Sequence, residues 1–220
     1  MEIQVMKNIL GENERIAAEN KALFAEKKVY AINLMGSPGA GKTSVLEKTM
    51  ERLKDKLNMA VIEGDLFTSK DADRIAKHDV PVIQINTSGG CHLDAAMVQR
   101  VAQKMDLDAI DLLIVENVGN LVCPAEFDVG EDDKGVVLSI TEGDDKPMKY
   151  PLIFKESSIA LLNKVDILPY CNFDMATAKE DILTLHPNMT VEEVSCVTGE
   201  GMEAWCSWLL RKVAEKKGQV

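Results

Sequence analysis

The chain has 220 residues, 46% of them hydrophobic, and carries a formal net charge of −11. This composition supplies enough apolar side chains for one core, so we expect a single domain over residues 1–220, with residues 1–27 as a helical extension. The negative charge argues against nucleic acid as a partner, because phosphate backbones are bound by clustered Lys and Arg. No apolar run approaches the length of a membrane span, and the N-terminus lacks the basic-then-apolar pattern of a signal peptide.

Five cysteines are spread widely along the sequence. Their odd number and wide spacing do not resemble a disulfide framework. We therefore expect a cytoplasmic protein in which a functional cysteine serves as a metal ligand or as a reactive thiol. The patterns around Cys171, Cys196 and Cys206 are typical of core or loop thiols.

Residues 1–27 come first in chain order and predict a helix, because Ile9, Ile16 and Leu23 recur at heptad spacing. Gly11 weakens this helix, since glycine is a poor helix former. The pattern favours a helix packed on the domain, and a partner-binding helix is the alternative.

Strands and helices then alternate. Apolar runs rich in strand-forming residues predict strands at residues 29–35, 59–65, 82–86, 112–116, 135–141, 159–163 and 191–197. Apolar residues at helical spacing predict helices near residues 42–57, 70–78, 92–105, 174–185 and 202–216. The charged segment 142–156 is typical of a long polar loop. Near-continuous apolar strands separated by helices predict an α/β fold with a mostly parallel, doubly wound sheet and helices on both faces, which binds ligands at the carboxyl ends of its strands.

The first predicted strand runs into a glycine-rich loop, Gly-Ser-Pro-Gly-Ala-Gly-Lys-Thr at residues 36–43, and a helical pattern follows. This match to G-x-x-x-x-G-K-[ST] predicts a P-loop, the phosphate-binding loop of nucleoside triphosphatases, and a turn that merely connects two elements is the alternative. Backbone N–H groups face the β-phosphate, Lys42 reaches the β and γ oxygens, and Thr43 places its hydroxyl on Mg²⁺. The residues that we expect to bind the phosphates are Gly36, Ser37, Gly39, Ala40, Gly41, Lys42, Thr43 and Ser44.

A second motif, Asn163-Lys164-Val165-Asp166, ends the sixth predicted strand and indicates which base is bound. A carboxylate at Asp166 accepts hydrogen bonds from N1–H and from the exocyclic amine of guanine. Adenine presents a lone pair at N1 and no amine at C2, and a buried carboxylate without partners is strongly disfavoured. Asn163 meets the other edge of the base and the stem of Lys164 covers its face. With the P-loop, this motif predicts GTP and GDP as ligands.

The sequence Ser195-Cys196-Val197-Thr198-Gly199 ends the last predicted strand. It resembles the short loop whose backbone N–H groups bind the guanine O6 in GTPases, and its first three residues are the base-binding candidates. A turn that simply ends the strand is the alternative.

Mg²⁺ and the attacking water need carboxylates at neighbouring strand ends. Asp65 ends the second predicted strand and Glu116 ends the fourth. Glu116 is placed like the Walker B acid, with Glu in place of Asp, which leaves open whether it touches Mg²⁺ directly or through water. Asp71 and Asp73 lie where a first switch segment would run, although a solvated helix face explains them as well. The predicted catalytic set is Lys42, Thr43, Asp65 and Glu116, of which the last three are the predicted Mg²⁺ ligands.

Thiol and imidazole groups form a third constellation. Gly-Gly-Cys91-His92 follows the third predicted strand, and Cys123 lies seven residues beyond Glu116. These groups suit Zn²⁺ and Ni²⁺, and a turn after the two glycines brings Cys91 and His92 onto one ion. Three ligands per chain are too few for a closed structural site, which leaves an open, exchangeable site or one shared across a two-fold dimer axis. Taken alone, Cys91 also fits a small buried hydrophobe, and His92 a helix-start or surface residue.

Together these motifs resemble HypB, a GTPase family that helps to deliver nickel to [NiFe] hydrogenase. The resemblance covers essentially the whole chain and rests on the P-loop, on Asn-Lys-Val-Asp at 163–166, on Ser-Gly-Gly-Cys-His at 88–92 and on Glu-Asn-Val-Gly-Asn-Leu-Val-Cys-Pro at 116–124. The related urease nickel chaperones, UreG, carry Cys-Pro-His in the corresponding region, whereas here cysteine and histidine are adjacent. Ser37 occupies the second position of the P-loop, so the additional lysine of the ParA and nitrogenase iron-protein branch is missing.

The resemblance implies a GTP-promoted homodimer whose interface holds nickel or zinc on Cys91, His92 and Cys123 from both subunits. It implies transfer of Ni²⁺ with a HypA-like nickel chaperone to the hydrogenase large subunit, in the cytoplasm and without nucleic acid or membrane. Some members carry an N-terminal Cys-x-x-Cys-Gly-Cys motif or a histidine-rich stretch, and neither occurs in this sequence. The resemblance then leaves Cys91, His92 and Cys123 as the single site that binds the delivered metal. In such dimers a lysine from residues 142–156 reaches the nucleotide of the partner subunit, and Lys149 is one candidate.

Glu116 and Cys123 lie on one short segment, so a nucleotide that reorders residues 116–119 moves Cys123 and changes the metal affinity. No glutamine or arginine is placed by motif to orient water, so we expect slow hydrolysis by in-line attack on the γ-phosphate. Binding needs thiolates and a neutral imidazole, so acid favours metal release. The alternatives are a related GTPase that serves urease nickel or a cobalamin enzyme, and a metal-binding dimer whose nucleotide is barely turned over.

Overall fold

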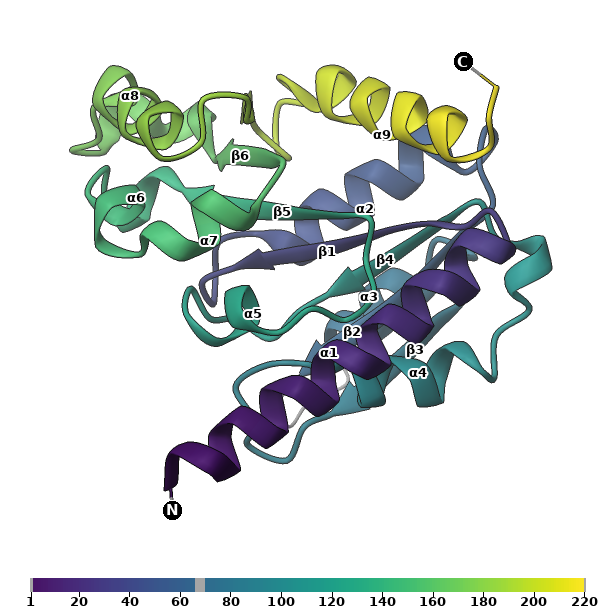
Figure 1. The fold of residues 1–220 in the computed structure, drawn as a ribbon. Helices are drawn as coiled ribbons and strands as arrows, with labels where there is room; N and C mark the ends of the chain where they lie inside the picture. The colour runs from purple at the N-terminus through teal and green to yellow at the C-terminus, as the bar shows by residue number, and fades with distance from the viewer. Residues whose placement is uncertain (1, 66–69, 220) are drawn as a thin grey trace.

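The computed structural model describes the backbone of residues 2–65 and 70–219, and the side chains of these ranges except those of residues 2–10, 70 and 73. The described chain folds around one sheet with helices on both faces (Figure 1). The carboxyl ends of the strands meet at one edge of this sheet, where the predicted site residues gather.

Seven strands of the described chain form the sheet, in the order β3-β2-β4-β1-β5-β6-β7. All neighbouring strands are parallel, so the predicted doubly wound α/β fold is confirmed. The strand order reverses direction between β4 and β5 around β1, which is where open parallel sheets bind ligands. The strands are β1 (Tyr30–Gly36), β2 (Met59–Asp65), β3 (Val82–Asn86), β4 (Leu112–Glu116), β5 (Asp133–Ser139), β6 (Ile159–Asn163) and β7 (Thr190–Val194).

Helices connect the strands and cover both faces of the sheet (Figure 1). The α-helices are α1 (Glu2–Glu26), α2 (Lys42–Leu53), α3 (Lys70–Ala76), α4 (Ala95–Ala102), α5 (Cys123–Glu126), α6 (Lys146–Lys149), α7 (Pro151–Glu156), α8 (Met175–Leu185) and α9 (Met202–Lys216). Short 3-10 helices are η1 (Leu107–Ala109), η2 (Ile140–Glu142) and η3 (Val165–Tyr170).

Three apolar layers hold the helices on the sheet. On one face, α2 and α9 pack on strand side chains such as Ile32 and Ile114. The Trp205 indole in this layer donates to Thr49 Oγ1 at 2.8 Å, which satisfies its buried N–H. On the other face, α1 and α4 cover the half of the sheet nearer β3, and α7 and α8 cover the half nearer β7. The burial of both faces explains why the central strands are almost uniformly apolar.

Helix α1 packs against α4, so the packing interpretation of the N-terminal helix is confirmed. Phe24 is buried in the layer between α1, α4 and the sheet. Asn13 accepts a hydrogen bond from Ala95 N at 2.9 Å, and Asn20 donates to Ala95 O and to Val129 O, both at 2.9 Å. Helix α1 therefore fixes the N-terminus of α4 and the loop after α5, two segments that flank the predicted metal ligands.

The prediction of a polar loop at residues 142–156 is wrong, because this segment contains α6 and α7. Ile153 and Phe154 are buried against β5 and β6, and Pro147 is buried as well. Short helices can bury one apolar face on the sheet while their charged residues stay in solvent. The many charges of the segment obscured the few apolar residues that anchor it.

Several predicted boundaries also differ from the structure. The helix expected at 92–105 starts later, because Asp94 is the N-cap of α4 and accepts from Met97 N at 2.7 Å. The strand expected at 135–141 ends at Ser139, which forms a capping box with Glu142 at the start of η2. The strand expected at 191–197 ends with β7 at Val194.

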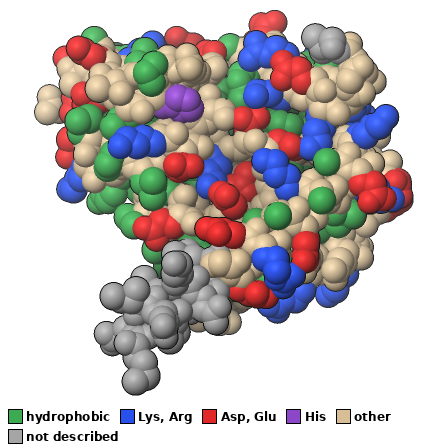
Figure 2. All heavy atoms as spheres, in the orientation of Figure 1, with side chains coloured by type: hydrophobic (Ala, Val, Ile, Leu, Met, Phe, Trp, Pro, Cys, Tyr) green, Lys and Arg blue, Asp and Glu red, His purple; other side chains and the backbone are tan. Residues whose placement is uncertain are grey.

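The surface carries charges of both signs. Acidic and basic side chains are interspersed on the face drawn in Figure 2. Ion pairs on the described surface include Lys27 with Asp108 at 2.8 Å. Within residues 2–65 and 70–219, no helix is both long and apolar enough to span a bilayer.

Candidate nucleotide and metal site

The predicted P-loop joins β1 to α2 at the carboxyl edge of the sheet. Gly36 and Gly41 have φ values of 149° and 100°, and a Cβ at either position would lie 2.3 Å from Val137 O or Asn163 Nδ2, respectively. Only glycine fits these two positions. Helix α2 follows Gly41 without a side-chain cap, so its first backbone N–H groups are left for a ligand.

Thr43 and Glu116 meet beside this loop. Thr43 Oγ1 donates to Glu116 Oε1 at 2.8 Å, and Lys42 Nζ donates to Gly36 O at 3.1 Å. Glu63 pairs with Glu116 in the register of β2 and β4, so the two carboxylates lie on neighbouring strand ends. Burial raises the pKa of Glu116 to about 7, and burial with the nearby Glu116 raises the pKa of Glu63 to about 8. The pKa of Lys42 is lowered by burial.

One oxygen of each of these carboxyl groups, Glu63 Oε2 and Glu116 Oε2, is buried without a hydrogen-bond partner among the described residues. Unpaired buried oxygens are costly, and they are the groups that a hard cation such as Mg²⁺ satisfies. The donor set beside the P-loop therefore fits a divalent cation.

A cavity of about 450 Å³ lies over the P-loop and the ends of β2 and β4. Asp65 and Asp71 line it, and the side chain of Asp73 lies outside the described residues. The structure thus brings together the predicted Lys42, Thr43, Asp65 and Glu116 in one cavity. A larger cavity of about 630 Å³ lies near the amino ends of β2 and β3, away from every motif identified in the sequence.

Two residues of the nucleotide cavity were missed by motif analysis. Glu63 lies two residues before Asp65 on β2. Because side chains two residues apart on a strand point to the same face, this spacing could have predicted that Glu63 joins Asp65 in the site. Arg74 lines the cavity from α3, where it donates to Asp71 Oδ1 at 3.0 Å and to Ser44 Oγ at 3.1 Å. No spacing rule marks this arginine, because it reaches the cavity through the packing of α3 on α2.

The predicted base motif lies against the P-loop. Asn163 Nδ2 donates to Ala40 O at 2.9 Å, and Lys164, with φ 70°, donates from Nζ to Gly39 O at 2.7 Å. Asp166 Oδ1 accepts from Ser195 Oγ at 2.6 Å. Side-chain contacts therefore join the P-loop, the base motif and the loop after β7 into one site.

The loop after β7 turns around the Ser195 hydroxyl. Ser195 Oγ accepts from Val197 N at 3.2 Å and from Thr198 N at 3.1 Å, and Cys196 Sγ donates to Asn163 Oδ1 at 3.7 Å. Burial raises the pKa of the Cys196 thiol to about 11, so this cysteine stays protonated at neutral pH. The loop is a tight turn whose backbone lies next to Asp166.

The three predicted soft ligands come together at the same edge of the sheet. One ligand atom from each of Cys91, His92 and Cys123 lies within 4.8 Å of the other two. Cys91 Sγ and His92 Nδ1 are 3.5 Å apart, and the positive φ values of Ser88 and Gly89 make the turn before them. Cys91 is exposed, so its alternative interpretation as a buried hydrophobe is wrong.

The local environment favours metal binding through a neutral imidazole. Burial lowers the pKa of His92. The neighbouring Cys91 thiol and partial burial raise the pKa of Cys123, so a metal ion that binds there has to displace the thiol proton. Thiols and imidazole in an accessible cluster fit Ni²⁺ or Zn²⁺ and not Mg²⁺.

The segment that follows Glu116 lies between the P-loop and the metal ligands. Asn120 N donates to Gly36 O at 3.0 Å, and a Cβ on Gly119 would lie 2.8 Å from Pro38 N. On the other side, Asn117 Oδ1 accepts from Leu93 N at 3.0 Å. The segment 117–120 therefore borders both the nucleotide cavity and the thiol cluster.

A glycine-rich loop at the carboxyl edge of a doubly wound parallel sheet, with paired carboxylates beside it, defines a P-loop nucleotide-binding protein. The family described as CobW/HypB/UreG, nucleotide-binding domain, matches residues 30–193. The hydrogenase maturation factor HypB of Escherichia coli is 49% identical over 207 residues, which cover 94% of this chain and 71% of that protein.

Solved structures of HypB proteins have the same fold as this chain. HypB from Helicobacter pylori in complex with nickel superposes with a TM-score of 0.87 at 38% identity, covering 93% of this chain and 96% of that one. HypB from Archaeoglobus fulgidus gives a TM-score of 0.87 at 35% identity, covering 92% and 99%. The chain belongs to the HypB family of hydrogenase maturation factors.

Proposed function

We propose that this chain is a GTP-hydrolysing metallochaperone that binds nickel or zinc and helps to insert nickel into [NiFe] hydrogenase. The observation that carries the proposal is the position of residues 117–120. This segment contacts the P-loop on one side and the segment after Cys91 and His92 on the other. The relatives named hydrogenase maturation factors support a role in hydrogenase maturation. The nickel complex of the Helicobacter pylori protein supports nickel as the metal that is delivered.

In this proposal the P-loop binds the phosphates of GTP. The uncapped N-terminus of α2 and Lys42 hold the phosphate oxygens, and Lys42 stabilises the charge that develops as water attacks the γ-phosphate in line. Thr43, Asp65 and Glu116 would hold Mg²⁺, which neutralises phosphate charge when bound. The buried oxygen of Glu116 that lacks a partner among the described residues supports this assignment.

Guanine is the base that fits the second motif. Asp166 accepts from N1–H and from the exocyclic amine, while Asn163 and Lys164 meet the opposite edge and the face of the base. The contact of Ser195 with Asp166 at 2.6 Å supports this role, because it holds the carboxylate beside the loop of Ser195, Cys196 and Val197. A carboxylate held in this way rejects adenine.

The thiol cluster binds the cargo. Three ligands per chain leave the ion open to exchange, and we propose that a GTP-promoted homodimer completes the site across its axis. A HypA-like nickel chaperone and the hydrogenase large subunit are the proposed partners, in the cytoplasm. The continuous sheet supports a single GTPase domain over the whole chain, with α1 as an extension.

A second recipient has one specific observation in its favour. The Helicobacter pylori relative that is named a hydrogenase/urease maturation factor is 38% identical over 218 residues. Delivery of nickel to urease is therefore the second candidate function.

Hydrolysis assays test the enzymatic part of the proposal. The wild-type chain should hydrolyse GTP slowly and leave ATP intact, and Lys42→Ala should lower GTP turnover by roughly 100-fold, because it removes a cation that stabilises transferred charge. Lys48→Ala, on the exposed side of α2, is the matched control and should keep wild-type turnover. Wild-type turnover no higher than that of Lys42→Ala would favour a metal-binding dimer with a structural nucleotide.

A further inference from the structure

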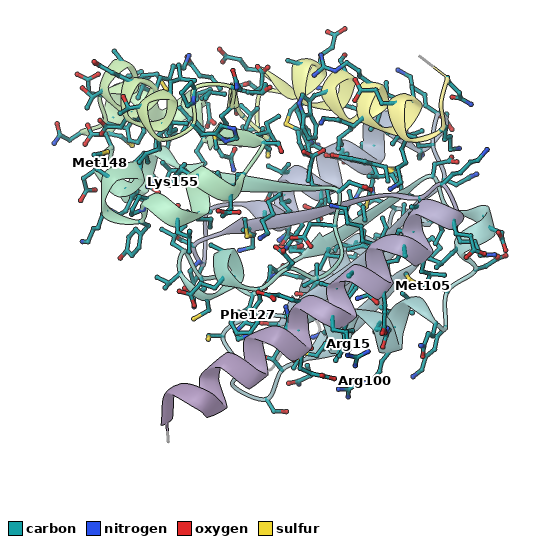
Figure 3. The ribbon with its side chains drawn as sticks, in the orientation of Figure 1. Arg15, Arg100, Met105, Phe127, Met148 and Lys155 are labelled. Atoms are coloured by element: carbon teal, nitrogen blue, oxygen red, sulfur yellow. The ribbon has the colours of Figure 1, made fainter. Side chains whose placement is uncertain are left out.

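The His92 imidazole lies face to face with the ring of Phe127. Their ring centroids are 3.9 Å apart, and the ring planes are inclined by 24°. Phe127 directly follows the last residue of α5 and lies just below that helix in Figure 3. The contact therefore joins a candidate metal ligand to a side chain 35 positions further along the chain.

Stacking has a direct consequence for coordination. Histidine binds a metal ion through a nitrogen in the plane of its ring, so the ring edge has to be free while the faces can be covered. Phe127 covers a face of His92, and the Nδ1 atom on the ring edge points to Cys91 Sγ at 3.5 Å. This orientation is the one that a shared ion requires.

Other contacts of the loop hold its backbone. Asn120 Nδ2 donates to Cys91 O at 3.4 Å, and Leu93 N donates to Asn117 Oδ1 at 3.0 Å. These bonds leave the rotation of the imidazole about its side-chain torsions unset. Within the described part of the chain, the aromatic contact to this imidazole comes from Phe127.

Phe127 contributes little to the apolar core. Its side chain is half-buried, and it lies outside the three apolar layers of the described residues. Phe173 is also half-buried, but it packs against the layer under α7 and α8. A large aromatic ring usually packs in the core. This ring stacks on a single imidazole instead, which points to a role at that imidazole.

We propose that Phe127 is a positioning residue for His92: its ring holds the imidazole edge toward the thiols of Cys91 and Cys123 and thereby sets the nickel affinity. Cys123 is the first residue of α5 and Phe127 follows its last, so a displacement of α5 moves one ligand together with the support of another. This inference rests on the proposed metal-binding function.

Nickel titration and NMR of the full chain test the proposal. Phe127→Leu should weaken Ni²⁺ binding by about 10-fold or more, in the range found when groups that orient metal ligands are removed. Phe127→Tyr keeps an aromatic ring and should bind like wild type. Phe173→Leu is the matched control for loss of a half-buried ring, and it should leave the nickel affinity unchanged.

The imidazole signals report the role independently of affinity. In the metal-free wild type, the ring current of Phe127 should shift the His92 ring protons upfield, and Phe127→Leu should abolish this shift. With Zn²⁺ bound, long-range proton–nitrogen spectra should show coordination through Nδ1 in wild type, and a weakened or mixed signal in Phe127→Leu. The chain has only three histidines, and His92→Gln assigns the signal.

The two proposals fail in different ways. Wild-type nickel affinity and an unchanged His92 spectrum in Phe127→Leu would overturn the positioning role while the metal site stands. Absence of nickel binding in the wild type itself, equal to that of Cys123→Ala, would overturn the proposed metal function and this inference with it.

Discussion

Glu63 and Glu116 lie on neighbouring strand ends beside the P-loop, and each has one buried oxygen without a partner among the described residues. Burial raises the pKa of Glu63 to about 8 and that of Glu116 to about 7, from an ordinary value of 4.5. Glu63 is therefore mostly protonated at pH 7 in the nucleotide-free protein. These two carboxyl groups make the cavity sensitive to pH.

The nucleotide-free protein should lose stability as the pH rises from about 4.5 to about 8. Over this range the folded chain binds more protons than the unfolded chain, so the free energy of unfolding falls with pH. Glu63→Gln removes one of the two carboxyl groups, and its decline should end near pH 7, where Glu116 has titrated. Urea unfolding at pH 5, 6, 7 and 8 measures both curves.

Glu180→Gln, at an exposed position of α8, controls for the change from Glu to Gln and should keep the wild-type curve. Parallel curves for the wild type and Glu63→Gln between pH 5 and pH 8 would show that Glu63 titrates as an ordinary carboxyl group.

Sequence analysis predicted the residues whose chemistry depends on local spacing. The P-loop, Asn163–Asp166 and the Cys91–His92 pair are short motifs, and their chemistry is readable without the fold. Glu63 became visible only through the register of β2 with β4. Phe127 was missed because its contact with His92 depends on how α5 and the loop after β3 pack together.

The segment after β4 is the element that connects the two candidate sites. Asn117 is buried: its Oδ1 accepts from Leu93 N at 3.0 Å and its Nδ2 donates to Asn33 Oδ1 at 3.1 Å. Leu93 is buried as well, and a Cβ on Gly64 would lie 2.8 Å from its Cγ, next to Asp65. One amide therefore ties the loop of Cys91 to the end of β4.

Asn117→Ala should lower the free energy of unfolding by about 2 kcal/mol, because it leaves Leu93 N and Asn33 Oδ1 buried without a partner. It should also reduce the difference in nickel affinity between the GDP and GTP-analogue states, since the amide link between the two sites is lost. Chemical unfolding and nickel titration measure the two effects.

Thr49→Ala is the control for stability, because it leaves the buried Trp205 Nε1 without its partner under α9, away from the metal ligands. It should cost a similar free energy of unfolding and keep the nucleotide dependence. A full nucleotide dependence in Asn117→Ala would exclude Asn117 as the link.

Element boundaries were less predictable than the presence of the strands and their parallel pairing. Strands buried on both faces stand out as apolar runs, so the seven strands and their parallel pairing followed from the sequence. The helices α6 and α7 did not, because their anchors Ile153 and Phe154 are two apolar residues in a charged segment. Helix α5 has only four residues, too few for a periodic signal.

At the scale of the whole molecule, the sheet places two different binding chemistries along one edge. Carboxyl oxygens lie beside the P-loop over β2 and β4, and the candidate soft ligands lie beyond them, with residues 117–122 between the two. In the proposed function, this arrangement makes the metal affinity depend on the nucleotide state, and by reciprocity it makes the nucleotide affinity depend on the metal. In the same proposal, GTP hydrolysis resets the metal site, as delivery of the metal requires.

The most direct test of this coupling is a titration of Ni²⁺ and Zn²⁺ into the wild type and Cys123→Ala, each with GDP and with a non-hydrolysable GTP analogue. The wild type should bind Ni²⁺ with affinities that differ at least about 5-fold between the two nucleotides, the lower end of ordinary coupling. Cys123→Ala should bind weakly and show no nucleotide dependence. Equal affinities in all four protein–nucleotide states would contradict the coupling of the two sites.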